Sequence, residues 1–190
     1  MDRRPCMAAV HVPLGWHRIP WLPGDSWTHT IAPRFQDLGV SSLELKRCVY
    51  VIRLNGNICI DYGKGTSPTV YVGEGNLRQR LKHHEYWAPK LKELLDCYKF
   101  QLCVAVPRVR NNPYAYKDAE AALIQYFGNQ YGTTPLWNKQ YEKRSAPHYE
   151  YAKSSIKEAL NKRSGAKYQW AIRPMRSSDF HRVFTQPPKS

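Results

Sequence analysis

One short segment, from Thr69 to His84, places several chemically reactive side chains close together. Its first residues are β-branched or aromatic and predict a strand that delivers Tyr71 into a turn with two glycines. A basic helix follows and carries Arg80 and His84 one turn apart. Because neither a third glycine nor a Gly-Lys-Ser/Thr sequence follows, the segment does not match a nucleotide phosphate loop. We therefore interpret it as one wall of a site built from side chains.

An acidic residue on a later helix is a second candidate for chemistry. The pattern of residues 116–127 predicts a helix, and Glu120 precedes Leu123 and Phe127 by about one and two helical turns. The carboxylate of Glu120 should therefore face the buried side of this helix, where an unpaired charge is costly. From this helix alone we expect a salt bridge to Lys or Arg, with a metal ion as the alternative.

These residue types suit the hydrolysis of a phosphodiester. The reaction needs an activated water, a cation for the charge that develops on the phosphate, and help for the leaving oxygen. A lone glutamate is a hard oxygen ligand that suits one Mg²⁺ ion with several retained waters. Arg80 can bind phosphate through its guanidinium fork. Tyr50, on an earlier predicted strand, and His84 are the alternative acceptors of the proton from water.

The elements that position these residues follow from hydrophobic periodicity. Four segments have the pattern of strands, and we expect antiparallel pairing among them: 47–54, 57–62, 69–73 and 100–107. The dipeptide Asn55-Gly56 is a type I′ hairpin signal, which predicts that 57–62 returns along 47–54. Four segments are predicted helices: 76 to about 86 with Asn76 as the cap, a segment beginning at Pro89, 116–127, and 150–163.

The charge balance points to a polyanionic partner. The 190 residues include 29 Lys and Arg against 15 Asp and Glu, a formal net charge of +14. Each Lys or Arg that neutralises a phosphate releases counterions, which favours binding to nucleic acid. A basic surface that is merely solvated is the alternative. We do not expect a membrane partner, because no long basic amphipathic helix and no run of about 18 apolar residues occurs.

The cysteines indicate a reducing compartment. There are five, an odd number, and none forms a CxxC pair. Cys48, Cys59 and Cys103 lie in apolar runs, where a free cysteine acts as a small hydrophobic residue. A zinc site is not expected, because structural zinc recruits closer ligand pairs. The N-terminal apolar stretch is too short for a signal peptide, so we expect a cytoplasmic protein.

In order along the chain, these features resemble the GIY-YIG nuclease superfamily. Two tripeptides stand where the signature triplets would be: Cys48-Val49-Tyr50 and Tyr71-Val72-Gly73. Three further segments resemble the basic helix, the glutamate helix and the closing motif of the family: Asn76 to Leu81, Ala119 to Ile124, and Pro135-Leu136-Trp137-Asn138. The resemblance covers residues 46–140.

The resemblance implies an α+β fold with a small, mostly antiparallel three-stranded sheet flanked by helices. Residues 46–140 would form this nuclease core, with 55–68 as an inserted hairpin or loop. Residues 1–45 form a Pro- and Trp-rich N-terminal arm that we expect to pack on the core. Residues 141–190 form a basic C-terminal helix and tail.

The resemblance also implies a divalent-metal-dependent endonuclease with Glu120 as the protein ligand of Mg²⁺, for which Mn²⁺ could substitute. The implied catalytic residues are Tyr50, Tyr71, Arg80, His84, Glu120 and Asn138. Asn138 is implied either as a residue at the edge of the site or as one that fixes a loop.

The chain departs from the family pattern at several positions. Cys48 replaces the glycine of the first triplet, and Glu74 stands near the place where many members have a lysine. Glu74 is either a second acidic group beside the metal or an exposed turn residue, and we favour the latter. Lys64 or Lys82 could replace the missing lysine. The adjacent His83 and His84 compete for one role, and the spacing from Arg80 favours His84.

A compact core without a separate DNA-binding domain fits a sequence-specific type II restriction endonuclease that cuts duplex DNA as a homodimer. Six basic residues are the expected DNA contacts: Lys64, Arg78, Lys82, Lys139, Lys143 and Arg144. One alternative is a structure- or single-strand-selective nuclease of repair or mobile elements, whose aromatic tail would stack on unpaired bases. The other is a non-catalytic module that binds nucleic acid.

Overall fold

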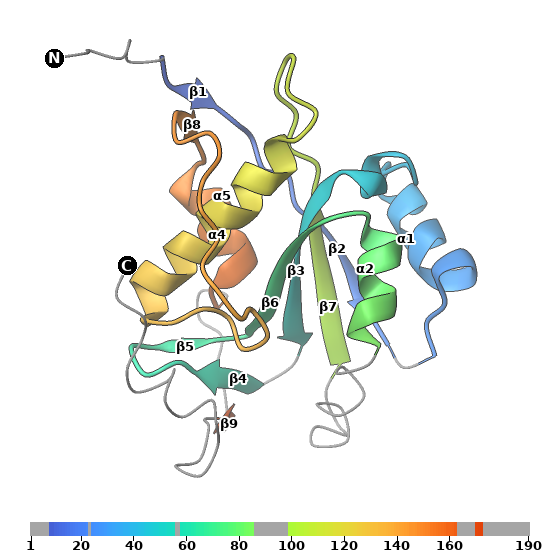
Figure 1. Cartoon of the computed structure of the whole chain (residues 1–190). Helices are drawn as coiled ribbons and strands as arrows, with labels where there is room; N and C mark the ends of the chain where they lie inside the picture. The colour runs from blue at the N-terminus through green and yellow to red at the C-terminus, as the bar shows by residue number, and fades with distance from the viewer. Residues whose placement is uncertain (1–7, 23, 56–57, 86–98, 163–169, 173–190) are drawn as a thin grey trace, which may run out of the picture.

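The computed structural model describes five segments of the chain: 8–22, 24–55, 58–85, 99–162 and 170–172. It confirms the α+β class (Figure 1). In the view of Figure 1 the central sheet stands upright, with the yellow helix α4 (Ala115–Tyr131) and the green helix α2 (Leu77–His84) on either side of strand β6.

The central sheet has four antiparallel strands in the order β2-β7-β3-β6. Their bounds are His17–Trp21 for β2, Cys48–Asn55 for β3, Thr69–Gly75 for β6 and Lys99–Ala105 for β7. The strands predicted at 47–54, 69–73 and 100–107 are therefore confirmed. Every residue of β3 except Asn55 is buried, because neighbouring strands cover both edges and packed elements cover its faces.

The expectation of three strands is wrong, because the N-terminal segment supplies a fourth. Strand β2 pairs with β7 from His17↔Val104 to Trp21↔Phe100 at the edge of the sheet. Pro20 lies within this strand opposite Gln101, and an edge position tolerates a residue that cannot donate to the ladder. The proline-rich composition of the N-terminal segment is thus compatible with an edge strand.

The predicted hairpin between 47–54 and 57–62 is also wrong. Strand β4 (Ile58–Asp61) belongs to a separate sheet of order β5-β4-β9, with β5 (Thr66–Ser67) antiparallel and β9 (Trp170–Ile172) parallel to it. Both edges of β3 are already occupied by β6 and β7. This long-range pairing overrides the local turn signal of Asn55-Gly56, whose second residue lies outside the described segments.

The remaining elements surround the two sheets. Six further helices or strands have these bounds: a π-helix η1 (Trp27–Ile31), α1 (Ala32–Asp37), a 3₁₀-helix η2 (Glu44–Lys46), α5 (Lys153–Leu160), and the parallel pair of β1 (Val10–His11) with β8 (Tyr149–Glu150). The helix predicted from Pro89 lies outside the described residues. Among the helices that the structure describes, none is both long and apolar enough to span a membrane.

A buried arginine ties the C-terminal helix to the central sheet. Arg53 of β3 is 5% exposed, and its guanidinium donates to the backbone carbonyls of Glu158, Ala159 and Asn161 at 2.7–2.8 Å. Helix α5 therefore ends beside the end of β3 that carries Arg53. Cys48, Cys59 and Cys103 are free and buried, as the apolar runs around them predicted.

Candidate active site

The site is built around a hydrogen bond between Tyr50 and His84. Tyr50 lies in the middle of β3 and is fully buried, and its hydroxyl is 2.7 Å from Nε2 of His84. His84 is the last residue of α2 and is 5% exposed. The helix is held in place by its cap Asn76, which accepts a bond from the backbone N–H of Gln79, and by buried leucines. Strand and helix thus bring together two residues that sequence reasoning treated as alternatives.

Tyr71 joins the same aromatic cluster from the neighbouring strand. It pairs with Ile52 in the register of β3 and β6, so its side chain shares a face of the sheet with Tyr50. The centroid of its ring lies 4.5 Å from that of His84 and 6.0 Å from that of Tyr50. Tyr71 is half-buried, so it is the member of the cluster that borders solvent.

Gly73 is needed because the two tyrosine rings cover its Cα atom. A Cβ atom at this position would lie 2.5 Å from the hydroxyl oxygen of Tyr50 and 2.5 Å from Cε1 of Tyr71. The glycine that ends the second signature tripeptide therefore makes room for both rings at once.

We expect Gly73→Ala to displace these rings and to lower the stability of the fold. Overpacking of a filled site costs about 1–3 kcal/mol in unfolding free energy. Urea unfolding measures that cost, and the melting temperature should fall with it. Gly15→Ala is the matched control, because a Cβ at Gly15 meets no atom within 4 Å. Equal stability of the two variants would contradict the packing argument.

The Tyr50–His84 pair is neutral at physiological pH. Burial, followed by the charges of Arg80 and His83, lowers the pKa of His84 to about 4. Burial also raises the pKa of Tyr50 well above its ordinary value. The imidazole can therefore accept the phenolic proton through Nε2 when its own proton is on Nδ1, or donate to the phenol in the other tautomer.

The lowered pKa of His84 should make the folded protein less stable in acid. The unfolded chain takes up this proton near pH 6.5, whereas the folded chain does so only near pH 4. The contribution of His84 to stability is therefore full above pH 6.5 and is lost as the pH falls toward about 4. The advantage of the wild type over His84→Gln in unfolding free energy should shrink across this window in urea titrations. An advantage that stays constant across this window would contradict this linkage.

Arg80 is oriented by Glu74 at the rim of the aromatic cluster. Its Nη2 lies 3.1 Å from a carboxylate oxygen of Glu74, and its Nε donates to the backbone carbonyl of the same residue at 3.0 Å. The arginine side chain is 47% exposed, whereas that of Glu74 is only 15% exposed. The interpretation of Glu74 as an exposed turn residue is therefore wrong. Two bonds fix one edge of the guanidinium and leave the side chain accessible to an anion.

Glu120 lies half-buried on α4, within the electrostatic field of the same cluster. Burial raises its pKa to about 8, the charges of Glu74 and Glu142 add to the shift, and Arg80 opposes it. No Lys or Arg in the described segments forms an ion pair with Glu120, so the salt bridge expected from its helix is not found among these residues. The carboxylate is thus placed where a cation would stabilise its charge.

Asn138 fixes a loop beside Tyr71. Its side-chain oxygen accepts from the backbone N–H of Val72 at 2.9 Å, and its side-chain nitrogen donates to the carbonyl of Val72 at 2.8 Å. The side chain thus extends the ladder at the free edge of β6, and the backbone N–H of Trp137 bonds to the carbonyl of Val70. Of the two implied roles, the structure supports the fixing of a loop.

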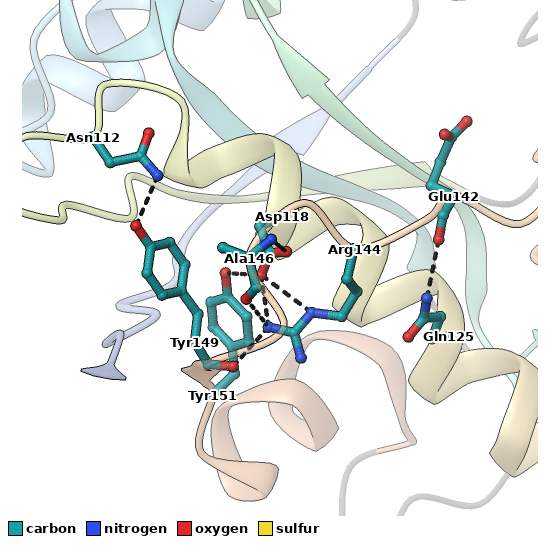
Figure 2. Close-up of polar contacts among 8 residues, drawn as sticks. All are labelled: Asn112, Asp118, Gln125, Glu142, Arg144, Ala146, Tyr149 and Tyr151. Carbon is teal, nitrogen blue, oxygen red and sulfur yellow. Dashed lines mark hydrogen bonds and ion pairs between the residues drawn. The ribbon is translucent and has the colours of Figure 1, made fainter. Parts of the chain in front are cut away.

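The basic residues expected to contact DNA are spread over several elements. Five of them are exposed: Lys64, Arg78, Lys82, Lys139 and Lys143. Arg144 differs, because its side chain is only 21% exposed and its guanidinium is bound within the protein (Figure 2). Arg144 therefore holds a loop together in this structure and is not placed as a free surface cation.

Asp118, which the sequence did not single out, is the centre of the network around Arg144. It is 1% exposed and lies in the first turn of α4, where its Oδ2 accepts from Arg144 and Tyr151 and its Oδ1 accepts from the backbone N–H of Ala146 (Figure 2). An acidic residue in a first turn is a weak helix signal, and only the folded chain shows its partners.

Asp118→Ala should destabilise the fold by about 3–5 kcal/mol, because it breaks a buried ion pair and leaves the arginine without its carboxylate. Asp37→Ala, at an exposed position of α1, is the control and should cost less than about 0.5 kcal/mol. Both values come from urea unfolding. A cost for Asp118→Ala no larger than that of the control would show that this network does not stabilise the loop.

Comparisons of the chain with protein-family models, with curated proteins and with solved structures found no match. A functional assignment therefore rests on the sequence motifs and on the geometry of the cluster.

Proposed function

We propose that the protein is a divalent-metal-dependent DNA endonuclease of the GIY-YIG type. The observation that carries this proposal is the buried bond of 2.7 Å between Tyr50 and His84, beside Tyr71 and within the fields of Arg80 and Glu120. A core tyrosine ordinarily bonds to a backbone carbonyl. Here the partner is a neutral imidazole, and an accessible arginine lies nearby.

Arg80 is the proposed phosphate ligand. Its guanidinium is held at one edge by Glu74, which reduces the conformational entropy lost when the other edge binds a phosphate. The charge of Arg80 also contributes to the lowered pKa of His84. A phosphate bound to Arg80 would offset this charge, so substrate binding should make His84 more basic.

The proton of the attacking water is taken up by the Tyr50–His84 pair. Tyr50 accepts this proton on its phenolic oxygen while its own proton passes to Nε2 of His84, so the pair moves one proton without forming a free phenolate. Because Tyr50 is fully buried, the water must reach it past Tyr71, the half-buried member of the cluster. Tyr50 and His84 thus act together as one proton relay.

Glu120 fits the role of a single metal ligand. The described segments contain no group of three or more His, Cys, Asp or Glu side chains that could hold a metal ion. A Mg²⁺ site with one protein carboxylate remains compatible with this finding, because Mg²⁺ commonly keeps several waters and binds substrate phosphate. When bound, the ion would polarise the phosphate and acidify its water. The raised pKa of Glu120 reflects first its burial and then the charges of Glu74 and Glu142, so a bound cation would stabilise the ionised carboxylate.

We further propose a type II restriction endonuclease that acts on duplex DNA as a homodimer, since two-fold symmetry matches cleavage of both strands of a palindrome. The net charge of +14 supports a nucleic acid as the partner.

The test is to incubate purified protein with unmodified plasmid and Mg²⁺ and to sequence the ends of the products. Discrete fragments with a shared terminal sequence are expected. Cleavage only of branched or single-stranded DNA would contradict the restriction activity and would favour a structure-selective nuclease.

A further inference from the structure

A groove with a volume of about 540 Å³ opens between η2 and the loop that leaves β7. Leu43, Glu44 and Arg47 line one side of it, and loop residues from Val106 to Pro113 line the other. In Figure 1 this yellow-green loop projects from the top of the molecule between β7 and α4. None of these residues belongs to the aromatic cluster described above.

The groove opens at the end of the central sheet where Glu74 and Arg80 lie. Cys48, which follows Arg47, pairs with Gly75 at the end of β6, and Val49 pairs with Ala105 at the end of β7. The charges of Glu74 and Arg47 both act on the hydroxyl of Tyr116, so this tyrosine lies near a residue of the site and a residue of the groove. A polymer held at Arg80 could therefore continue into the groove.

Both exposed arginines and apolar residues line the groove. Arg47 and Arg108 are exposed, the latter with 76% of its side chain accessible, and Arg110 is exposed on the same loop. Val106, Val109 and Pro113 supply apolar surface between them. A guanidinium binds phosphate or the major-groove edge of guanine through its fork. Apolar surface can contact sugars and thymine methyl groups. This combination matches duplex DNA better than it matches a protein partner.

The loop that carries Arg108 is held in a defined conformation. Val109 and Asn112 form a bridge across it, and Asn111 between them adopts a left-handed backbone with φ of 61°. The side chain of Asn112 donates to the hydroxyl of Tyr149 at 2.7 Å (Figure 2) and accepts from the backbone N–H of Tyr114 at 2.9 Å. Ordering of the loop before binding lowers the entropy lost when DNA binds.

The carboxylate of Glu44 is hydrogen-bonded to the guanidinium of Arg108 in the free protein. One carboxylate oxygen of Glu44 bonds to Nη2 of Arg108, and the other accepts from the backbone N–H and the hydroxyl of Ser41, both at 2.8 Å. The carboxylate is therefore fixed in the lining of the groove, where it would compete with a phosphate for the guanidinium.

We propose that this groove binds the duplex DNA that flanks the scissile phosphate, with Arg47 and Arg108 as its DNA ligands and Glu44 as an internal competitor that Arg108 leaves on binding. The inference rests on the proposed nuclease function and adds a binding surface to it.

The test is fluorescence anisotropy with short labelled duplexes in EDTA, which prevents cleavage, over a series of salt concentrations. Arg108→Ala should weaken binding about tenfold and reduce the slope of log affinity against log salt by about one. Lys157→Ala is the control for a lost positive charge. It lies on α5 beside Glu158, which Arg53 ties to the opposite end of β3, and it should change affinity less than about twofold. Glu44→Gln should strengthen binding about threefold by releasing Arg108.

The possible outcomes distinguish a failure of the groove proposal from a failure of the proposed nuclease function. If the wild type cuts DNA but Arg108→Ala binds as Lys157→Ala does, the groove proposal is overturned and the nuclease stands. If Arg108→Ala weakens binding and Glu44→Gln does not strengthen it, the competitor role of Glu44 is wrong. If the wild type neither binds nor cuts DNA, the proposed function fails and the groove proposal fails with it. Equal melting temperatures would show that the variants are folded, because an exposed ion pair contributes little stability.

Discussion

Replacing Glu120 with glutamine should abolish metal-dependent cleavage while leaving DNA binding in EDTA within about threefold of the wild type. Glutamine keeps the shape of the side chain and removes the only carboxylate that we assign to the metal, so a loss of at least about 1,000-fold in cleavage rate is expected. Cleavage rates in Mg²⁺ and anisotropy in EDTA measure the two effects separately. The matched control is Glu142→Gln, on a residue whose charge adds to the raised pKa of Glu120 and to which we assign no ligand role.

The stability of the Glu120→Gln variant gives an independent check. The pKa of Glu120 is raised from 4.5 to about 8, so the folded state holds this proton more tightly than the unfolded chain does. The stability that this proton provides is full below pH 4.5 and is lost as the pH rises toward about 8. Glutamine does not titrate, so at about pH 9 the variant should melt at a higher temperature than the wild type. A variant that still cuts DNA, or that melts lower at high pH, would contradict this placement of Glu120.

Tyr50→Phe should lower the cleavage rate by about 100- to 10,000-fold, the range typical for loss of a proton-transfer group. Phenylalanine preserves the packing of the ring on β3 and removes the hydroxyl that bonds to His84. The unfolding free energy should fall by about 1–2 kcal/mol, because a buried hydrogen bond is lost. Single-turnover cleavage and urea unfolding are the two measurements.

Tyr62→Phe is the matched control for this experiment. The hydroxyl of Tyr62 is also buried and bonds to the carbonyl of Thr69, but Tyr62 lies outside the aromatic cluster around His84. Its variant should lose a similar amount of stability and keep its cleavage rate. If Tyr50→Phe and Tyr62→Phe had the same effect on cleavage, the hydroxyl of Tyr50 would have no part in the reaction.

Local patterns in the sequence predict the elements that carry the candidate site. Strands β3 and β6 follow from period-two patterning and β-branched residues, α2 follows from its cap Asn76, and α4 follows from its apolar face. Each of these signals lies within one element. The order of the motifs along the chain then identifies the side chains that the fold brings together.

Long-range pairing could not be predicted in the same way. The Asn55-Gly56 signal favours a hairpin, but β7 occupies the edge of β3 that β4 would need. The position of β2 at the edge of the sheet is likewise determined by its pairing with β7, which lies far from it in the sequence. Strand order depends on which edges remain free once the core has formed, and a local turn preference is weak compared with the burial of a whole strand.

The hydrogen-bond partners of buried charged residues could not be predicted from the sequence either. Arg53 in a strand and Asp118 in a helix look like ordinary polar positions, yet each is the centre of a network with residues many positions away. Glu74 is the same case within the site, because its pairing with Arg80 depends on how the turn after β6 closes.

The most direct test of the nuclease function is to assay wild-type protein in Mg²⁺ and in Mn²⁺ against supercoiled plasmid, single-stranded DNA, branched DNA and RNA. The arrangement of Tyr50, His84, Arg80 and Glu120 predicts that duplex DNA is cleaved in either metal and that EDTA stops the reaction. Folded, monodisperse protein that cuts none of these substrates with either metal would contradict the assignment of this cluster as a hydrolytic site.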